Sequence, residues 1–135
     1  MIKGIGHLGL IVKDMEKSLH FYCSILGLQK AFEIHDDHDK PWIVYIKVSE
    51  GQFIELFYGG AHKPQEVENQ IGFHHLCLEV HDIYEMANHL KQNGITLDIE
   101  PARGKAHNLQ CWAKDPDGNR IEFMQLDPAS PHMNC

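Results

Sequence analysis

The chain has 135 residues, of which 43% are hydrophobic, so it is long enough to bury the core of one domain. Its 12 basic and 19 acidic residues give a net charge of −7, which argues against binding to nucleic acid or to an anionic membrane, because both depend on Lys and Arg. The four cysteines have no C-x-x-C spacing and no apolar run reaches membrane-spanning length, so we expect a cytoplasmic protein.

The first half of the chain predicts the order strand, helix, strand, strand, strand over residues 4–58. Asp14 is a suitable N-cap for an amphipathic helix that would end at Gly27. The polar segment 35–41 is typical of a turn or loop between two strands. From their apolar or alternating patterns, we expect strands at 5–12, 28–34, 42–48 and 53–58.

The second half, residues 72–126, repeats this order after a predicted linker at 59–71. Asp82 and Glu85 form a capping-box pattern at the start of a helix that would end near Gly94. Residues 101–107 are predicted to form a basic loop, and 127–135 a loose tail in which His132 lies at the surface. Strands are expected at 72–80, 95–99, 109–113 and 119–126.

An internal repeat relates the two halves, which we interpret as two modules of one domain covering residues 1–135. The motif His-Leu-x-Leu-x-Val occurs at 7–12 and again at 75–80, and an Ile-Glu pair occurs in the last strand of each half. The repeat therefore selects four polar positions. They are His7, Glu55, His75 and Glu122.

These four side chains are candidate metal ligands. Two neutral imidazoles and two carboxylates can complete most of the coordination sphere of a divalent ion and leave room for water or substrate. Each residue alone would more simply be a polar residue on a half-exposed strand. Both glutamates, however, stand in apolar runs, where a carboxylate without a cation or hydrogen-bond donors is costly.

Four segments make the chain resemble the vicinal oxygen chelate superfamily: His-Leu-Gly-Leu-Ile-Val, Ser-Leu-His-Phe-Tyr-Cys-Ser-Ile-Leu-Gly-Leu, Ile-Glu-Leu-Phe and Asp-Pro-Asp-Gly-Asn-Arg-Ile-Glu. This superfamily includes glyoxalases, bleomycin-resistance proteins and extradiol dioxygenases, and the resemblance covers residues 4–126. It implies an α+β fold in which paired βαβββ modules form an open, curved, mixed sheet around a metal-binding cleft, with helices on the outer face. It also implies a homodimer.

The resemblance assigns the metal ligands to His7, Glu55, His75 and Glu122, a set most like that of short bacterial glyoxalase I. It implies one divalent ion, with nickel or cobalt favoured and zinc, manganese or iron as alternatives. The implied reaction is proton abstraction alpha to a carbonyl through a metal-stabilised enediolate, with a hemithioacetal as candidate substrate. Glu122 would be the base and Glu55 its partner. Alternatives are a related metal-dependent epimerase, an extradiol dioxygenase, or a small-molecule-binding resistance protein of the same fold.

Five further residues are candidates for binding a small-molecule substrate. Glyoxalase I has an arginine four residues after its first ligand, where this chain has Ile11, so an anionic group would need other partners. Instead of binding substrate, the basic candidates could form a solvated turn, and the aromatic candidates could pack in the core. The candidates are Arg103, Lys105, His107, Phe53 and Trp112.

Overall fold

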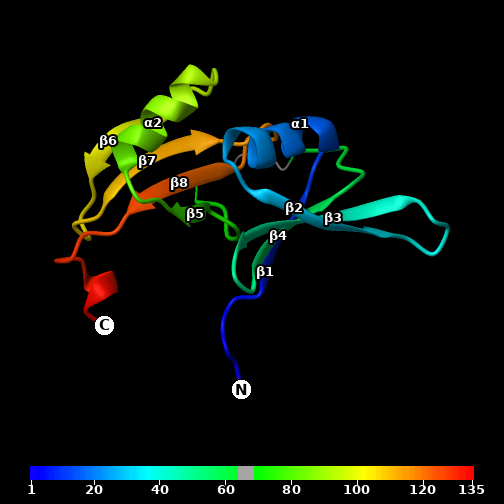
Figure 1. Cartoon of the computed structure of the whole chain (residues 1–135), viewed down its shortest axis with the longest axis horizontal. Coiled ribbons are helices and arrows are strands. Elements are labelled where there is room, and N and C mark those ends of the chain that lie inside the picture. The colour runs from blue at the N-terminus through cyan, green and yellow to red at the C-terminus, as the bar shows by residue number, and fades with distance from the viewer. Residues whose placement is uncertain (64–68) are drawn as a thin grey trace. The chain divides into compact units, whose positions relative to one another are not determined.

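The chain folds into two compact units, Met1–Gln65 and Glu66–Cys135, each built on one four-stranded sheet. The computed structural model describes residues 1–63 and 69–135 (Figure 1). Within each unit a helix connects the first strand to the second, so the α+β class and the repeated βαβββ order are confirmed. The linker predicted at 59–71 includes residues 64–68, which lie outside the described residues.

The sheet of the first unit has the strand order β1-β4-β3-β2, with β1 parallel to β4 and the other pairs antiparallel. One face carries the buried apolar side chains of β3 and β4, while the alternate residues of the same strands point to the other face. The elements are β1 His7–Ile11, α1 Met15–Leu19, η1 His20–Ile25, β2 Gln29–His35, β3 Pro41–Ser49 and β4 Gln52–Phe57.

The sheet of the second unit has the equivalent order β5-β8-β7-β6 and the same single parallel pair, β5 with β8. Helix α2 buries Ile83, Ala87 and Leu90 and contacts β6, β7 and β8 (Figure 1). The elements are β5 Leu76–Glu79, α2 Ile83–Gln92, β6 Ile99–Arg103, β7 Leu109–Lys114, β8 Arg120–Gln125 and the short 3₁₀ turn η2 Pro131–Met133.

The first helix begins as predicted but does not stay α-helical. The Asp14 side chain accepts a hydrogen bond from the Lys17 N–H, and after one turn the chain widens into the π-helical segment η1. Phe21 and Tyr22, adjacent in this segment, are both buried in the core. Among the described helices, none is both long enough and apolar enough to cross a membrane.

Two strand predictions in the second unit are wrong. The strand predicted at 95–99 lies at β6 instead, because the Ile95 N–H still bonds to the Leu90 carbonyl and the first backbone hydrogen bond to β7 comes from the Asp98 N–H to the Trp112 carbonyl. The predicted basic loop therefore begins inside β6. Pro101, which has no backbone N–H, is tolerated there because β6 is the edge strand and pairs with a neighbouring strand on one side only. Strand β5 is also shorter than predicted, so His75 stands just before it.

The segment after β8 is not the loose tail that the sequence predicts. The Asp127 carboxylate pairs with the Arg103 guanidinium at 2.6 Å, and Ser130 is fully buried. The side chain of Asn134 donates hydrogen bonds to the carbonyls of Pro128 and Ser130. These contacts hold residues 127–135, hereafter the C-terminal segment, against the second unit.

Candidate metal and substrate site

The parallel pair β1 and β4 brings His7 and Glu55 together in the first unit. His7 Nε2 lies 3.4 Å from Glu55 Oε2, and the Glu55 side chain is only 7% exposed. The hydroxyl of Tyr45, which stands opposite Glu55 on β3, donates to this carboxylate. That hydrogen bond raises the pKa of Tyr45, because ionising the phenol would place two negative charges side by side.

Gly9 leaves space beside this pair. It stands opposite Glu55 in the parallel ladder, and a Cβ atom placed on it would lie 3.4 Å from a Phe57 ring carbon and 3.7 Å from Glu55 Oε2. A larger side chain at this position would therefore cover the carboxylate. Its absence keeps one side of Glu55 open to a ligand.

The second unit repeats the arrangement with His75 and Glu122. Their Nε2 and Oε2 atoms are 3.0 Å apart, and the Glu122 side chain is 13% exposed. Trp112 stands opposite Glu122 in the ladder, as Tyr45 does opposite Glu55, and its ring centroid lies 4.7 Å from that of His75. The Arg120 guanidinium lies over the Trp112 ring, 4.8 Å from its centroid, so Trp112 contacts both Arg120 and His75.

The spacing within each pair suits ligands of a single divalent ion. Donors about 2.1 Å from one ion lie roughly 3 Å apart when they are neighbours in its coordination sphere. The two pairs, at 3.4 and 3.0 Å, fit this spacing without rearrangement. Each unit supplies two donors, and within residues 1–63 and 69–135 no group of three His, Cys, Asp or Glu side chains is gathered as a metal site.

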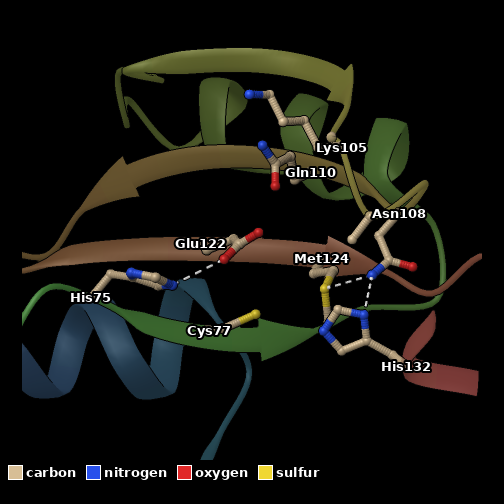
Figure 2. Close-up of a pocket in the computed structure, with 10 residues that line it drawn as sticks. His75, Cys77, Lys105, Asn108, Gln110, Glu122, Met124 and His132 are labelled. Atoms are coloured by element: carbon tan, nitrogen blue, oxygen red, sulfur yellow. Dashed lines mark hydrogen bonds and ion pairs between the residues drawn. The ribbon is translucent and has the colours of Figure 1, made fainter. Parts of the chain in front are cut away.

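A pocket of about 350 Å³ opens beside the His75–Glu122 pair (Figure 2). Its wall is formed by β5, β7, β8, the loop after β6 and the C-terminal segment, all within the second unit. It therefore joins the candidate metal ligands to a space of the size of a small-molecule site. The lining residues are His75, Cys77, Gly104, Lys105, Ala106, Asn108, Gln110, Glu122, Met124 and His132.

Of the predicted substrate-binding residues in the second unit, Lys105 lines this pocket. Arg103 pairs with Asp127 and also donates to the His107 carbonyl, so it links β6 to the C-terminal segment. His107 is exposed and takes a left-handed backbone conformation with φ +68°. Trp112 is 8% exposed and contacts His75 rather than the pocket space.

Phe53, the remaining predicted substrate-binding residue, lies in the first unit within an aromatic cluster. Its ring is 6.3 Å from Phe32 and 6.2 Å from Tyr45, and the last two rings are stacked at 4.2 Å. Because Tyr45 also donates to Glu55, this cluster supports one wall of the His7–Glu55 pair.

Sequence reasoning did not predict seven residues of the pocket wall, five of which lie outside the predicted loop at 101–107. Cys77 and Met124 stand two residues after His75 and Glu122, so strand alternation could have placed them beside the candidate ligands. Gln110 could have been found from its pairing with Met124 in the ladder. Asn108 and His132 had no such signal, because they meet through a contact between a loop and the C-terminal segment.

Comparison with known proteins identifies the family. Residues 4–123 match the Glyoxalase/Bleomycin resistance protein/Dioxygenase superfamily. The chain belongs to this superfamily. Superfamily relatives include a probable lactoylglutathione lyase of Synechocystis sp., 33% identical over 88% of this chain and 92% of that protein. Another is a probable lactoylglutathione lyase of Vibrio parahaemolyticus, 30% identical over 93% of each.

Solved structures of the same superfamily show the same fold. A glyoxalase/dioxygenase from Nostoc punctiforme matches with a TM-score of 0.75 and 21% identity, covering 93% of this chain and 92% of its own. A lactoylglutathione lyase from Agrobacterium tumefaciens matches with a TM-score of 0.68 and 20% identity, covering 92% of this chain and 94% of its own. The resemblance drawn from the sequence motifs is thus confirmed at the level of the superfamily.

Proposed function

We propose that this protein is a divalent-metal-dependent lyase of the glyoxalase I type, acting on the hemithioacetal of a 2-oxoaldehyde and glutathione. The observation that carries the proposal is the His–Glu pair at ligand spacing in each unit, 3.4 Å in the first and 3.0 Å in the second. Curated relatives named as probable lactoylglutathione lyases, which align with about nine-tenths of the chain, support the choice of reaction.

In this proposal the two pairs hold one metal ion between them, with His7, Glu55, His75 and Glu122 as its four protein ligands. The ion, when bound, acts as a Lewis acid toward the oxygens of the substrate. Nickel or cobalt is favoured, by resemblance to the short bacterial enzymes. The two carboxylates would balance the charge of a divalent ion, while the two imidazoles are neutral. Such charge balance lowers the cost of burying the carboxylates, which are nearly closed to solvent.

Glu122 is the proposed base, with Glu55 as its partner. Its carboxylate takes the proton from the carbon that bears the hydroxyl and sulfur, and the proton returns to the neighbouring carbon. The reaction is an internal redistribution of hydrogen, so it needs no external oxidant or reductant. Because the Glu122 side chain is 13% exposed and lines the pocket, little water competes for that proton.

We further propose a homodimer in which each site joins the first unit of one chain to the second unit of its partner. In this proposal a complete site needs one first unit and one second unit, because each supplies only two ligands. The twofold axis of a dimer would then relate two equivalent sites. The domain remains one functional module of residues 1–135 in this view, because neither unit alone supplies more than two of the ligands.

The deciding experiment is turnover of the methylglyoxal–glutathione hemithioacetal by protein stripped of metal and then reloaded with nickel, cobalt or zinc. We expect thioester formation that depends on the added ion and disappears in Glu122→Gln. Glu100→Gln is the matched control, because Glu100 lies on β6 in a surface ion pair with Lys91. Failure of every metal to restore turnover would reject the lyase proposal.

A further inference from the structure

We infer that His74 is a positioning residue for His75, and that together with Arg120 it fixes which ring nitrogen of His75 carries the proton when no metal ion is bound. This inference rests on the proposed function in one respect, since it takes His75 Nε2 as a metal-binding atom. His74 is not one of the four positions that the repeat selects. Its counterpart in the first unit, directly before His7, is Gly6. The second unit therefore has an imidazole beside its ligand that the first unit lacks.

Three contacts connect Arg120 to Glu122 through the two adjacent histidines, and these four residues are hereafter the histidine chain. Arg120 Nη1 lies 3.2 Å from His74 Nε2. His74 Nδ1 lies 2.6 Å from His75 Nδ1. His75 Nε2 lies 3.0 Å from Glu122 Oε2, as the dashed line in Figure 2 shows. Each imidazole thus uses both of its nitrogens, and because a neutral imidazole donates from one nitrogen and accepts at the other, the three contacts determine one another.

The guanidinium of Arg120 sets the direction of the histidine chain. Arginine only donates hydrogen bonds, so His74 Nε2 accepts and the neutral His74 ring carries its proton on Nδ1. This N–H donates to His75 Nδ1, which leaves the proton of His75 on Nε2, where it donates to the Glu122 carboxylate. A carboxylate only accepts, so both ends of the histidine chain require the same placement of protons.

Trp112 holds the histidine chain from the side. The Arg120 guanidinium lies 4.8 Å from the centroid of the Trp112 ring, and the centroid of the His75 ring lies 4.7 Å from it. The rings of His74 and His75 meet edge to face, with centroids 4.9 Å apart. The contacts therefore close a ring of four side chains, in which each is held by two neighbours.

The first unit provides an internal comparison. Its ligand follows Gly6, and Phe53 occupies the position equivalent to Arg120, so neither side chain can hydrogen-bond to an imidazole. The His7 side chain is 54% exposed and lies 3.4 Å from its carboxylate, against 29% and 3.0 Å for His75. The histidine with the additional neighbours is thus the one that is less exposed and closer to its carboxylate.

The histidine chain opposes metal binding by one hydrogen bond. A neutral His75 that offers the lone pair of Nε2 to a metal ion carries its proton on Nδ1. His74 then has to accept at Nδ1 and carry its own proton on Nε2, where it cannot also accept from Arg120. The bond from Arg120 to His74 therefore belongs to the metal-free protein only. A hydrogen bond from a charged donor corresponds to about ten-fold in affinity.

The first test determines the tautomers of the two histidines in the metal-free full chain. Long-range ¹H–¹⁵N correlation spectra at about pH 8.5, well above the ordinary histidine pKa of about 6.5, distinguish a protonated ring nitrogen from an accepting one. We expect the proton of His75 on Nε2 and that of His74 on Nδ1. Two unconstrained histidines would both carry it on Nε2, which an imidazole in water prefers, so an Nε2–H tautomer of His74 would overturn the inference.

The second test measures nickel binding by equilibrium dialysis in a double-mutant cycle. Arg120→Leu should bind nickel about ten-fold more tightly than wild type, because it removes a bond that only the metal-free protein makes. The same substitution in a His74→Ala background should leave the affinity unchanged. An equal gain in both backgrounds would assign the effect to the charge of arginine and contradict a role for His74.

His81→Ala is the matched control for His74→Ala, because His81 is exposed and lies outside the histidine chain. It should leave both the tautomers and nickel binding as in wild type. The spectra of the metal-free wild-type protein need no variant, so the inference can be overturned even if Arg120→Leu does not fold. Absence of nickel binding in wild type, together with the expected tautomers, would reject the proposed metal site and keep the histidine chain.

Discussion

Glu55 and Glu122 are carboxylates buried in positions where a charge without a partner would be costly. Each has a single imidazole within 3.4 Å and an aromatic residue of the neighbouring strand beside it, Tyr45 or Trp112. Each carboxylate also has a second hydrogen-bonding neighbour, the Tyr45 hydroxyl for Glu55 and the Cys77 thiol for Glu122. We propose Glu122 as the base from the resemblance to glyoxalase I, since these contacts do not distinguish the two carboxylates.

Replacing Glu122 by Gln should weaken binding of nickel or cobalt by about 100-fold or more. Loss of residues that only support ligands already costs 10- to 100-fold, and here an anionic donor itself is removed. Equilibrium dialysis with metal analysis measures the effect, with Glu100→Gln as control. Retention of wild-type affinity in Glu122→Gln would remove this residue from the ligand set.

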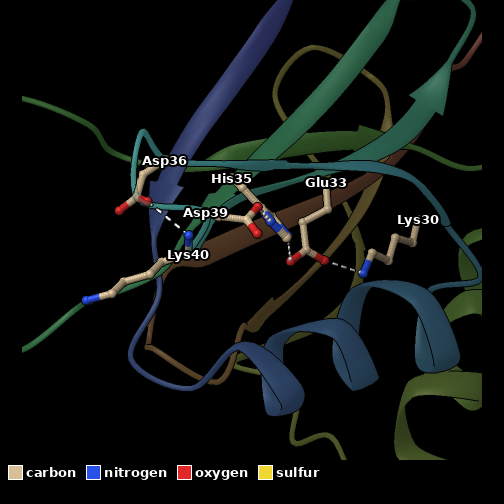
Figure 3. A network of polar contacts seen from close by, with 6 residues as sticks. All are labelled: Lys30, Glu33, His35, Asp36, Asp39 and Lys40. Atoms are coloured by element: carbon tan, nitrogen blue, oxygen red, sulfur yellow. Dashed lines mark hydrogen bonds and ion pairs between the residues drawn. The ribbon is translucent and has the colours of Figure 1, made fainter.

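A second cluster of polar residues, at the β2–β3 hairpin, predicts a pH effect unrelated to the pocket (Figure 3). His35 Nδ1 lies 3.0 Å from Asp39 Oδ1, and Nε2 lies 3.6 Å from Glu33 Oε1. The hydrogen bond with Asp39 is the main cause that raises the pKa of His35. A raised folded-state pKa means that this interaction stabilises the hairpin at acidic pH and is lost as the pH rises through that pKa.

Asp39→Asn should therefore bring the pKa of His35 down toward its ordinary value of about 6.5. Asn suits this position because Asp39 has φ +59°, a left-handed conformation that Asn tolerates. Titration of the His35 ring protons by NMR measures the change, with Asp37→Asn in the same loop as control. An unchanged titration of His35 in Asp39→Asn would assign its raised pKa to Glu33 instead.

The helices show how local signals act at the scale of an element. Asp82 accepts hydrogen bonds from the N–H groups of Tyr84 and Glu85, whereas Asp14 accepts only from that of Lys17. Helix α2 then continues for 10 residues, but α1 gives way after 5 to the wider η1. An Asp N-cap therefore begins both helices, although their windings then differ.

Asp82→Ala should lower the free energy of unfolding by about 1–2 kcal/mol, because it leaves two N–H groups of α2 without their acceptor. Asp14→Ala should cost less, about 0.5–1 kcal/mol, since one such bond is lost. Urea denaturation followed by circular dichroism measures both. A larger loss in Asp14→Ala than in Asp82→Ala would contradict this order.

At the scale of the whole molecule, the proposed site joins ligands from both units, and mixing two inactive variants tests this. His7→Ala and His75→Ala should each be inactive as homodimers. If units pair between chains, a heterodimer of the two variants contains one site with all four ligands intact. Random mixing after dissociation should then restore about a quarter of the wild-type turnover. Restored turnover supports pairing between chains, whereas none would place both units of a site in one chain.

Most of the fold could be predicted from the sequence because its signals are local or periodic. Alternation along the strands placed Glu55 on a different face from Ile54 and Leu56, and the repeat related His7 to His75. The prediction failed at β6, where pairing with β7 decides which residues are extended. It also failed at His75, which precedes β5, and at the C-terminal segment.

The sequence alone determined the four candidate ligands, since a repeat exposes equivalent positions however the chain folds. The tertiary structure decided that His7 faces Glu55 and that His75 faces Glu122, because strands distant in sequence lie parallel and adjacent only in the folded sheets. It alone placed His132 in the pocket. That position depends on one contact with Asn108 across 24 residues, and no periodic pattern encodes such a contact.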